Sequence, residues 1–204
     1  MARKREKPPW PEYYRATAKG PPWGTLRKAL TLAAKGSRKQ GRRLAIDLGC
    51  GAGRDARALL QRGWRVLAID KEADAIVFLR AAVAERYKGR LKTRVASFER
   101  IRLPKCDLVN ASYSLPFCRP KRFNQFWKEI VGSLRPGGWF AGHFFGVRDE
   151  WAGSTDMTFH TTKQVKALLR DLEIEFFKEK ELDGQTASGK DKHWHVLSVV
   201  ARRP

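Results

Sequence analysis

The chain has 204 residues, of which 42% are hydrophobic, and this suits one globular domain with its own core rather than a disordered chain. No run approaches the roughly 18 apolar residues that cross a membrane, and the first residues lack the apolar segment of a signal peptide, so we expect a cytoplasmic protein. The formal net charge of +21 favours anionic partners, although basic runs more often mark solvated surface.

The N-terminal residues 1–23 combine prolines, basic residues and several aromatic rings. Because disordered segments are poor in aromatic residues, we expect an irregular basic arm that docks in part on a domain spanning 24–204. Apolar residues at helical spacing predict a helix over 24–35. Basic residues cluster in 35–43 and again in 86–94, and these two runs are the candidate contacts to nucleic acid.

From Arg43 onward, short apolar runs alternate with longer segments of helical period, which is typical of an α/β fold with helices on both faces of a parallel sheet. Strands are predicted over 43–48, 65–70, 91–96, 107–111, 139–145, 174–180 and 194–201. Helices are predicted over 54–61, 73–87, 121–134 and 162–171, with an Arg-Pro-Gly-Gly stop at 135–138. Only the link 182–190 separates the last two strands, so we expect an antiparallel hairpin at the end of a mostly parallel, seven-stranded Rossmann-like sheet.

The segment 44–53 reads Leu-Ala-Ile-Asp-Leu-Gly-Cys-Gly-Ala-Gly, a buried strand that passes directly into a glycine-rich loop. Such a loop lets the backbone approach a ligand, and ligands of open α/β sheets bind beyond the carboxyl ends of the strands. Asp70 ends the second predicted strand, where a carboxylate can accept hydrogen bonds from the hydroxyls of a ribose. Capping of the following helix is the structural alternative for Asp70.

The glycine spacing separates two adenosine cofactors. A dinucleotide site has the pattern Gly-x-Gly-x-x-Gly, whereas Gly49, Gly51 and Gly53 follow Gly-x-Gly-x-Gly and Arg54 holds the last dinucleotide position. Asp47, just before the loop, is poorly placed for a pyrophosphate and well placed for an ammonium group. The pattern therefore favours S-adenosylmethionine over NAD.

With these motifs the chain resembles the Rossmann-like (class I) S-adenosylmethionine-dependent methyltransferases over about 44–202, and among them the tellurite-resistance-type small-molecule enzymes. The resemblance implies S-adenosyl-L-methionine as the cofactor, with the adenine at 97–98 and the methyl group facing the loop 110–116. The residues that it implies for cofactor binding are Asp47, Gly49, Cys50, Gly51, Gly53, Asp70, Lys71, Ser97, Phe98 and Asn110.

Two features depart from related enzymes. Ser97 stands where many relatives have an acid, and 110–116 replaces the Asn-Pro-Pro-Tyr loop of amino-group DNA methyltransferases. The chain also lacks paired catalytic cysteines, and its three cysteines, which we expect to be buried and reduced, suggest neither disulfides nor zinc. Methylation of a nucleic-acid base by either of those mechanisms is therefore not expected.

Catalytic residues are hard to predict, because in-line methyl transfer needs a base only when the acceptor carries a proton. The candidates are His160, His143 and Tyr14, with His160 favoured because its loop follows the fifth strand; a structural role is the alternative for each. Aromatic residues of the arm and of the loop after the fifth strand could form a lid or could simply dock; they are Tyr13, Tyr14, Trp23 and Trp151. His193 and His195 lack a third ligand, so no metal is assigned.

The sequence thus favours an enzyme that methylates a small molecule, with an anionic acceptor favoured by the charge. The alternative is an RNA methyltransferase or RNA-binding module that uses the basic runs. A non-catalytic protein that keeps the fold is the third possibility. The acceptor itself is not named by any motif.

Overall fold

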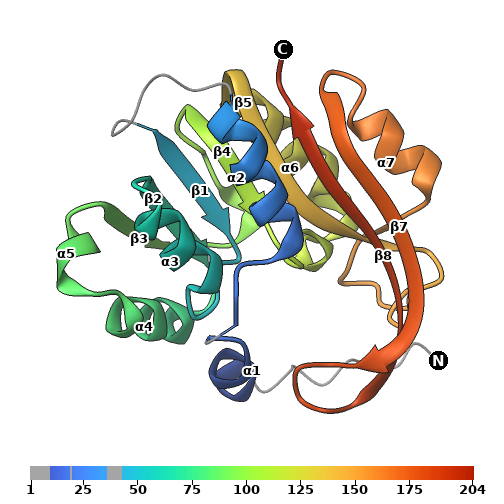
Figure 1. Ribbon diagram of the computed structural model, residues 1–204. Coiled ribbons are helices and arrows are strands. Elements are labelled where there is room, and N and C mark those ends of the chain that lie inside the picture. Colours follow the sequence, from blue (N-terminus) through green and yellow to red (C-terminus); the bar gives the residue numbers. More distant parts are fainter. Residues whose placement is uncertain (1–9, 19, 36–42) are drawn as a thin grey trace.

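The computed structural model describes residues 10–18, 20–35 and 43–204. An eight-stranded sheet with the order β3-β2-β1-β4-β5-β8-β7 runs through the molecule, and β6 pairs with the end of β5 (Figure 1). The strands are β1 (Leu44–Leu48), β2 (Arg65–Asp70), β3 (Leu91–Val95), β4 (Cys106–Ala111), β5 (Leu134–Gly146), β6 (Phe159–His160), β7 (Glu173–Gln185) and β8 (Asp191–Arg202). The predicted α/β fold is confirmed, and the two-residue β6 is the one strand that the sequence did not predict.

Helices cover both faces of the sheet (Figure 1). They are α1 (Trp10–Thr17), α2 (Gly24–Lys35), α3 (Arg54–Gln61), α4 (Ala73–Ala82), α5 (Glu85–Lys88), α6 (Pro120–Ser133) and α7 (Thr162–Leu168). Short 3₁₀ turns occur at Phe98–Arg100 and Leu115–Phe117. Within the described ranges, none of the helices has both the length and the apolar character that crossing a membrane requires.

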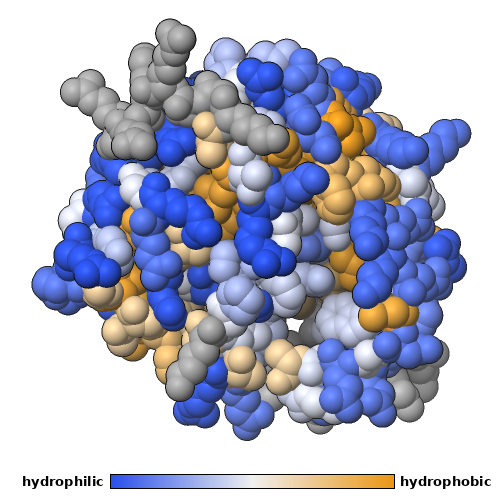
Figure 2. All heavy atoms as spheres, viewed as in Figure 1, coloured by the Kyte–Doolittle hydropathy of each residue, from blue (hydrophilic) through white to orange (hydrophobic). Residues whose placement is uncertain are grey.

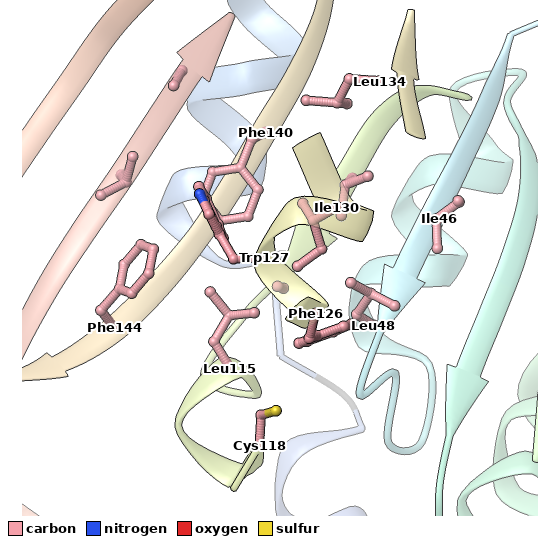
Figure 3. Close-up of a cluster of buried hydrophobic side chains, with 14 of the residues drawn as sticks. Ile46, Leu48, Leu115, Cys118, Phe126, Trp127, Ile130, Leu134, Phe140 and Phe144 are labelled. Carbon is pink, nitrogen blue, oxygen red and sulfur yellow. The ribbon is translucent and has the colours of Figure 1, made fainter. Parts of the chain in front are cut away.

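Two hydrophobic cores lie on opposite faces of the sheet. In one, α6 and α7 pack on the sheet, and Figure 3 shows Phe126 of α6 near Leu48 of β1 and Trp127 of α6 beside Phe140 of β5. In the other, α2, α3 and α4 cover the opposite face of β1, β2, β4, β5 and β8. Because β1 is covered on both faces, its nearly continuous apolar sequence is explained.

Several predicted boundaries are wrong; the helix expected over 162–171 ends at Leu168, and two other differences have a clear cause. The helix expected over 73–87 ends at Ala82, since Val83 takes an extended conformation and is buried, and a separate turn, α5, follows. The residues 135–138 do end α6, as predicted, but they continue as an irregular part of β5, where Gly137 and Gly138 exchange backbone hydrogen bonds with Arg203. Tertiary packing decided both boundaries.

The C-terminal antiparallel hairpin is confirmed, and its strands are longer than predicted. Residues 181–185 of β7 pair with 191–195 of β8, so only 186–190 form the connection. The added length is polar: His193 lies 2.7 Å from the Asp183 carboxylate and 3.0 Å from that of Glu181. Strand residues that form polar pairs show no hydrophobic periodicity in the sequence, so this part of the hairpin was not predicted.

The N-terminal arm is not irregular over Trp10–Thr17, which forms α1. Its predicted docking is confirmed, because Tyr14 is 2% exposed and its ring lies 5.9 Å from that of Phe78 in α4. The basic run 35–43 lies mostly outside the described residues, which resume at Arg43.

Candidate cofactor site

The loop between β1 and α3 lies at the carboxyl edge of the sheet and has the tight backbone that its glycines predict. Its three glycines, Gly49, Gly51 and Gly53, have positive φ angles of 66°, 50° and 84°. A Cβ atom on Gly53 would lie 2.1 Å from the Leu79 side chain, so packing against α4 also requires a glycine there. The backbone N–H groups of Gly49 and Cys50 donate to the Ile69 carbonyl, which joins the loop to the end of β2.

Asp70 faces this loop from the end of β2. Its Oδ2 accepts a hydrogen bond from the Gly51 N–H at 2.9 Å, and its Oδ1 accepts one from the Glu72 N–H at 3.0 Å. Burial raises the pKa of the carboxyl although both hydrogen bonds oppose this. Glu72, not Asp70, holds the cap position of α4, so Asp70 is not the helix cap that the sequence left open.

A second acidic cluster lies beside the loop. The Asn110 side-chain amide donates to Asp47 Oδ1 at 2.8 Å and to Asp55 Oδ2 at 2.9 Å, and all three side chains are buried. Burial, together with the charge of Asp55, raises the pKa of Asp47, and the Asn110 amide and the Ala56 backbone N–H oppose this shift. Sequence analysis missed Asp55; its position in the first helical turn after the glycine loop was the available signal.

Asp47 Oδ2 is buried and makes no hydrogen bond of normal geometry within the described part of the chain. A buried carboxylate oxygen without a donor is costly, and a cationic ligand group removes that cost. S-adenosylmethionine carries an ammonium and a sulfonium, so the residues at this edge fit the cofactor that the sequence favours. The structure brings Asp47, Asn110, the glycine loop and Asp70 together as predicted.

The other predicted cofactor residues lie around this edge. The Phe98 ring stacks on Phe126 at 4.7 Å between centroids, and Phe98 Cζ would lie 3.6 Å from a Cβ on Gly49. Ser97 is exposed, and Lys71 is exposed and lies 3.8 Å from the Glu72 carboxylate. Cys50 is buried and its thiol has a raised pKa because of burial; Cys106 and Cys118 are also buried and free, as predicted.

Tyr14 of α1 packs against the glycine loop at Gly51. Its ring atoms lie 3.5 Å from the position that a Cβ on Gly51 would take, and Trp10 stacks on it at 6.1 Å. Burial raises the pKa of its hydroxyl, with the charge of Asp70 acting in the same direction. The candidate catalytic Tyr14 therefore lies against the loop, in the place where a side chain on Gly51 would point.

His143 of β5 lies on the same face as Asn110 and is buried. Its ring is nearly parallel to that of Tyr113 at 4.0 Å, and its Nδ1 has no hydrogen-bond partner among the described residues. Burial lowers the pKa of His143 to about 3, so the imidazole is neutral at pH 7. It is therefore close to the β4 loop but is a weak base.

His160 lies on the opposite face of the sheet, away from the glycine loop. Its ring packs against Phe123 at 4.5 Å and Phe144 at 5.6 Å, and it lines a groove of about 640 Å³ between α6 and α7. Burial lowers its pKa to about 4. The structure does not bring this favoured catalytic candidate together with the cofactor residues.

The remaining candidates have other neighbours. Trp151 lies 4.3 Å from the Lys192 ammonium, which is buried and paired with Asp149, so Trp151 is part of that cluster. His195 lies 2.7 Å from the Glu179 carboxylate, and His193 contacts the carboxylates of the hairpin. Among the described residues no three potential ligands are grouped as a metal site.

Comparisons with known proteins agree with this geometry. Residues 45–138 match the family model described as a methyltransferase domain. TehB from Haemophilus influenzae superposes with a TM-score of 0.70 at 17% identity, and the match covers 87% of this chain and 62% of TehB. The present chain therefore spans less than two thirds of the TehB chain. No curated protein sequence matches significantly.

Two further structures have the same fold. A 1,6-didemethyltoxoflavin-N1-methyltransferase from Burkholderia thailandensis, with bound 1,6-didemethyltoxoflavin and S-adenosylhomocysteine, has a TM-score of 0.63 and 22% identity over 88% of this chain and 78% of its own. A S-adenosylmethionine-dependent methyltransferase from Methanosarcina mazei has a TM-score of 0.64 and 20% identity over 90% and 99%. The chain thus has the fold of class I methyltransferases, and residues 45–138 match the model of a methyltransferase domain.

Proposed function

We propose that this chain methylates a small molecule, with residues 24–204 as the methyltransferase domain and 1–23 as an arm that helps to close its site. The observation that carries this proposal is the burial of Tyr14 against the Gly51 loop, because α1 then covers the cofactor edge. A covered edge suits a small acceptor better than a folded macromolecule. The expected cytoplasmic location stays a prediction.

Each residue of the proposed site would contact a different part of the cofactor. When bound, S-adenosylmethionine supplies a methyl group activated by its sulfonium. Asp70 would accept hydrogen bonds from the ribose, Asp47 Oδ2 would accept from the ammonium, and the Phe98 ring would pack on the adenine. Tyr14 and Trp10 exclude water, which strengthens these charged contacts.

Calorimetry with S-adenosylhomocysteine tests the proposed site. We expect the wild-type protein to bind, and Asp47→Asn and Asp70→Asn each to weaken binding by about 2 kcal/mol, since each loses charge-assisted hydrogen bonds. Asp171→Asn, an exposed carboxylate after α7, is the matched control and keeps the wild-type affinity. Absence of binding at millimolar ligand, or tighter binding of NAD, would contradict the proposal.

Transfer of labelled methyl groups into fractionated metabolites and RNA then identifies the acceptor class. Turnover in either fraction excludes a non-catalytic protein that only keeps the fold. We expect the label in the metabolite fraction.

A second candidate function is methylation or binding of RNA, and the edge of the sheet at β3 favours it. Arg86, Lys88, Lys92 and Arg94 are exposed there. The guanidinium groups of Arg86 and Arg90 lie 4.8 and 5.2 Å from the Tyr87 ring. Basic groups beside a half-buried aromatic ring suit a single-stranded nucleic acid.

A further inference from the structure

Arg54, the first residue of α3, is a cation without a carboxylate partner among the described residues. Its Nε donates to the Pro21 carbonyl, and its guanidinium carbon lies 4.0 Å from the centroid of the Trp23 ring. The ion pairs found among the described residues do not include Arg54, which is half-buried. Its terminal N–H groups therefore have no anion to bind within the described part of the protein.

Aromatic rings surround this guanidinium. The Trp23 ring lies 4.5 Å from Tyr113, which stacks in turn on His143. Burial raises the pKa of Tyr13 to about 12 and raises that of Tyr113, whereas the charge of Arg54 opposes both shifts. Both phenols are thus neutral at pH 7, are within electrostatic range of Arg54, and have a hydroxyl proton to donate.

Tyr113 is held in a strained conformation. Its φ of 55° makes it the one described residue other than glycine with a positive φ. Such strain costs on the order of 1–3 kcal/mol and is typical of functional positions. Since the His143 ring stacks on it at 4.0 Å and the Trp23 ring lies 4.5 Å away, the surrounding structure determines where the Tyr113 side chain points.

The cluster adjoins the cofactor edge. Arg54 is followed by Asp55, whose carboxylate shares the Asn110 amide with Asp47, and Tyr113 is three residues beyond Asn110. Figure 2 shows an opening in the surface between α1 and the part of the β7–β8 hairpin that lies lower right in Figure 1.

We propose that Arg54, Tyr13 and Tyr113 bind the methyl acceptor, and that this acceptor is a planar organic anion: a flat ring that carries a carboxylate or phenolate. The guanidinium and the two neutral hydroxyls donate to the anionic oxygen, and the Trp23 and Tyr113 rings pack against the flat ring of the acceptor. This inference rests on the proposed small-molecule methyltransferase function and names its substrate class.

Methyl transfer to such an acceptor needs no base, because the attacking oxygen carries no proton. A lone pair of the anionic oxygen forms the O–C bond to the methyl group while the C–S bond breaks and its electron pair stays on sulfur. One positive and one negative charge are neutralised, and no proton moves. A neutral, buried His143 is therefore compatible with transfer, and it acts by positioning Tyr113.

The test measures binding of paired probes to the protein saturated with S-adenosylhomocysteine. Benzoate and 2-hydroxybenzoate are the anions, and benzamide and 2-hydroxybenzamide are their uncharged counterparts. Arg54→Gln removes the cation and Arg54→Lys keeps the charge. Arg57→Gln is the matched control, because Arg57 lies one turn further along α3 and donates to Ala18 O at 3.1 Å, so it anchors the same segment.

We expect the wild-type protein to bind each carboxylate at least tenfold more tightly than its amide. Arg54→Gln should abolish this preference, Arg54→Lys should keep part of it, and Arg57→Gln should keep all of it. Tyr13→Phe and Tyr113→Phe, which retain the rings, should each weaken carboxylate binding severalfold. The affinity for S-adenosylhomocysteine should be the same in every variant.

Several results would overturn the inference: equal binding of carboxylate and amide, no saturable binding of either carboxylate at about 10 mM, or equal loss of preference in Arg57→Gln and Arg54→Gln. Loss of S-adenosylhomocysteine binding in Arg54→Gln alone would assign Arg54 to the cofactor instead. If the wild-type protein does not bind S-adenosylhomocysteine, the proposed function itself fails, so the two failures are distinguishable.

Discussion

The buried carboxylates of Asp47 and Asp55 share one amide, that of Asn110. Two acids in a water-poor place repel each other, and a single NH₂ group satisfies only one oxygen of each. The second oxygen of Asp55 accepts a hydrogen bond from the Trp23 backbone N–H at 3.0 Å, whereas one oxygen of Asp47 has no donor in normal geometry among the described residues. An arrangement that is unfavourable for stability and lies at the carboxyl edge of a sheet is typical of a binding site.

Substitutions at Gly53 and Gly63 distinguish the cost of backbone strain from the cost of a steric clash. Gly53 and Gly63 have nearly the same φ, 84° and 85°, but a Cβ on Gly53 would meet Leu79 at 2.1 Å whereas one on Gly63 has only the end of Arg90 at 3.9 Å. Gly63→Ala should therefore lose about 1 kcal/mol of unfolding free energy and Gly53→Ala about 1–3 kcal/mol more, as measured by urea unfolding. Equal losses would show that the Leu79 side chain moves away freely.

His143 makes the protein sensitive to acid. Its folded pKa of about 3 lies below the usual value of about 6.5, so below pH 6.5 protons bind to the unfolded chain first. The contribution of neutral His143 to the free energy of unfolding is complete above pH 6.5. It is lost as the pH falls toward 3, by up to about 1.4 kcal/mol per pH unit.

Urea unfolding at several pH values between 7 and 4 measures this effect. His143→Gln should flatten the acid branch of the stability curve. His193→Gln is the control, because the Asp183 and Glu181 carboxylates raise the pKa of that exposed histidine and its contribution is lost as the pH rises. An unchanged acid branch in His143→Gln would show that His143 takes up protons in the folded protein.

At the scale of elements, α1 depends on its contacts, since eight residues are too few for a stable helix in water. Tyr14 packs on α4, and the following segment is joined to α3 by Arg57, Arg54 and Asp55. The segment that covers the cofactor edge is therefore held by separate contacts to two helices, α3 and α4.

Tyr14→Ala should release α1 without unfolding the domain. We expect faster amide hydrogen exchange over 13–18, by tenfold or more, with little change in the core strands, because Tyr14 is the buried anchor of the helix. Glu12→Gln, an exposed substitution in the same helix, is the control. Unchanged exchange in Tyr14→Ala would mean that the three contacts to α3 suffice to hold α1.

At the scale of the whole molecule, the net charge of +21 raises the question of a polyanionic partner. If single-stranded RNA binds the β3 edge, the triple variant Lys88→Gln, Lys92→Gln, Arg94→Gln should reduce the slope of log affinity against log salt by about 2. Lys163→Gln, Lys178→Gln, Lys180→Gln removes three exposed charges near the opposite edge and should have less effect. Weak binding with a shallow slope in the wild-type protein would exclude the RNA function.

Much of the fold was predictable because its signals are local. The bounds of α2, α3 and β2 agree with the prediction to the residue, since hydrophobic period and the glycines at helix ends act over a few positions. The ends of α4 and β7 were not predicted correctly, because the burial of Val83 and the ion pairs of His193 depend on distant partners. Local pattern predicts that an element exists, and packing decides where it ends.

The site divides in the same way. The sequence alone predicted the glycine loop, Asp47 and Asp70, and through them favoured S-adenosylmethionine, because these residues lie at the carboxyl ends of consecutive strands. The tertiary structure alone decided that Asp55 joins Asn110, that His160 lies on the far face, and that Tyr14 covers Gly51. Asn110 is 55 residues from Asp55 in the chain, and Tyr14 is similarly far from the elements it contacts. Contacts over such separations follow from the packing of whole elements, which no local pattern records.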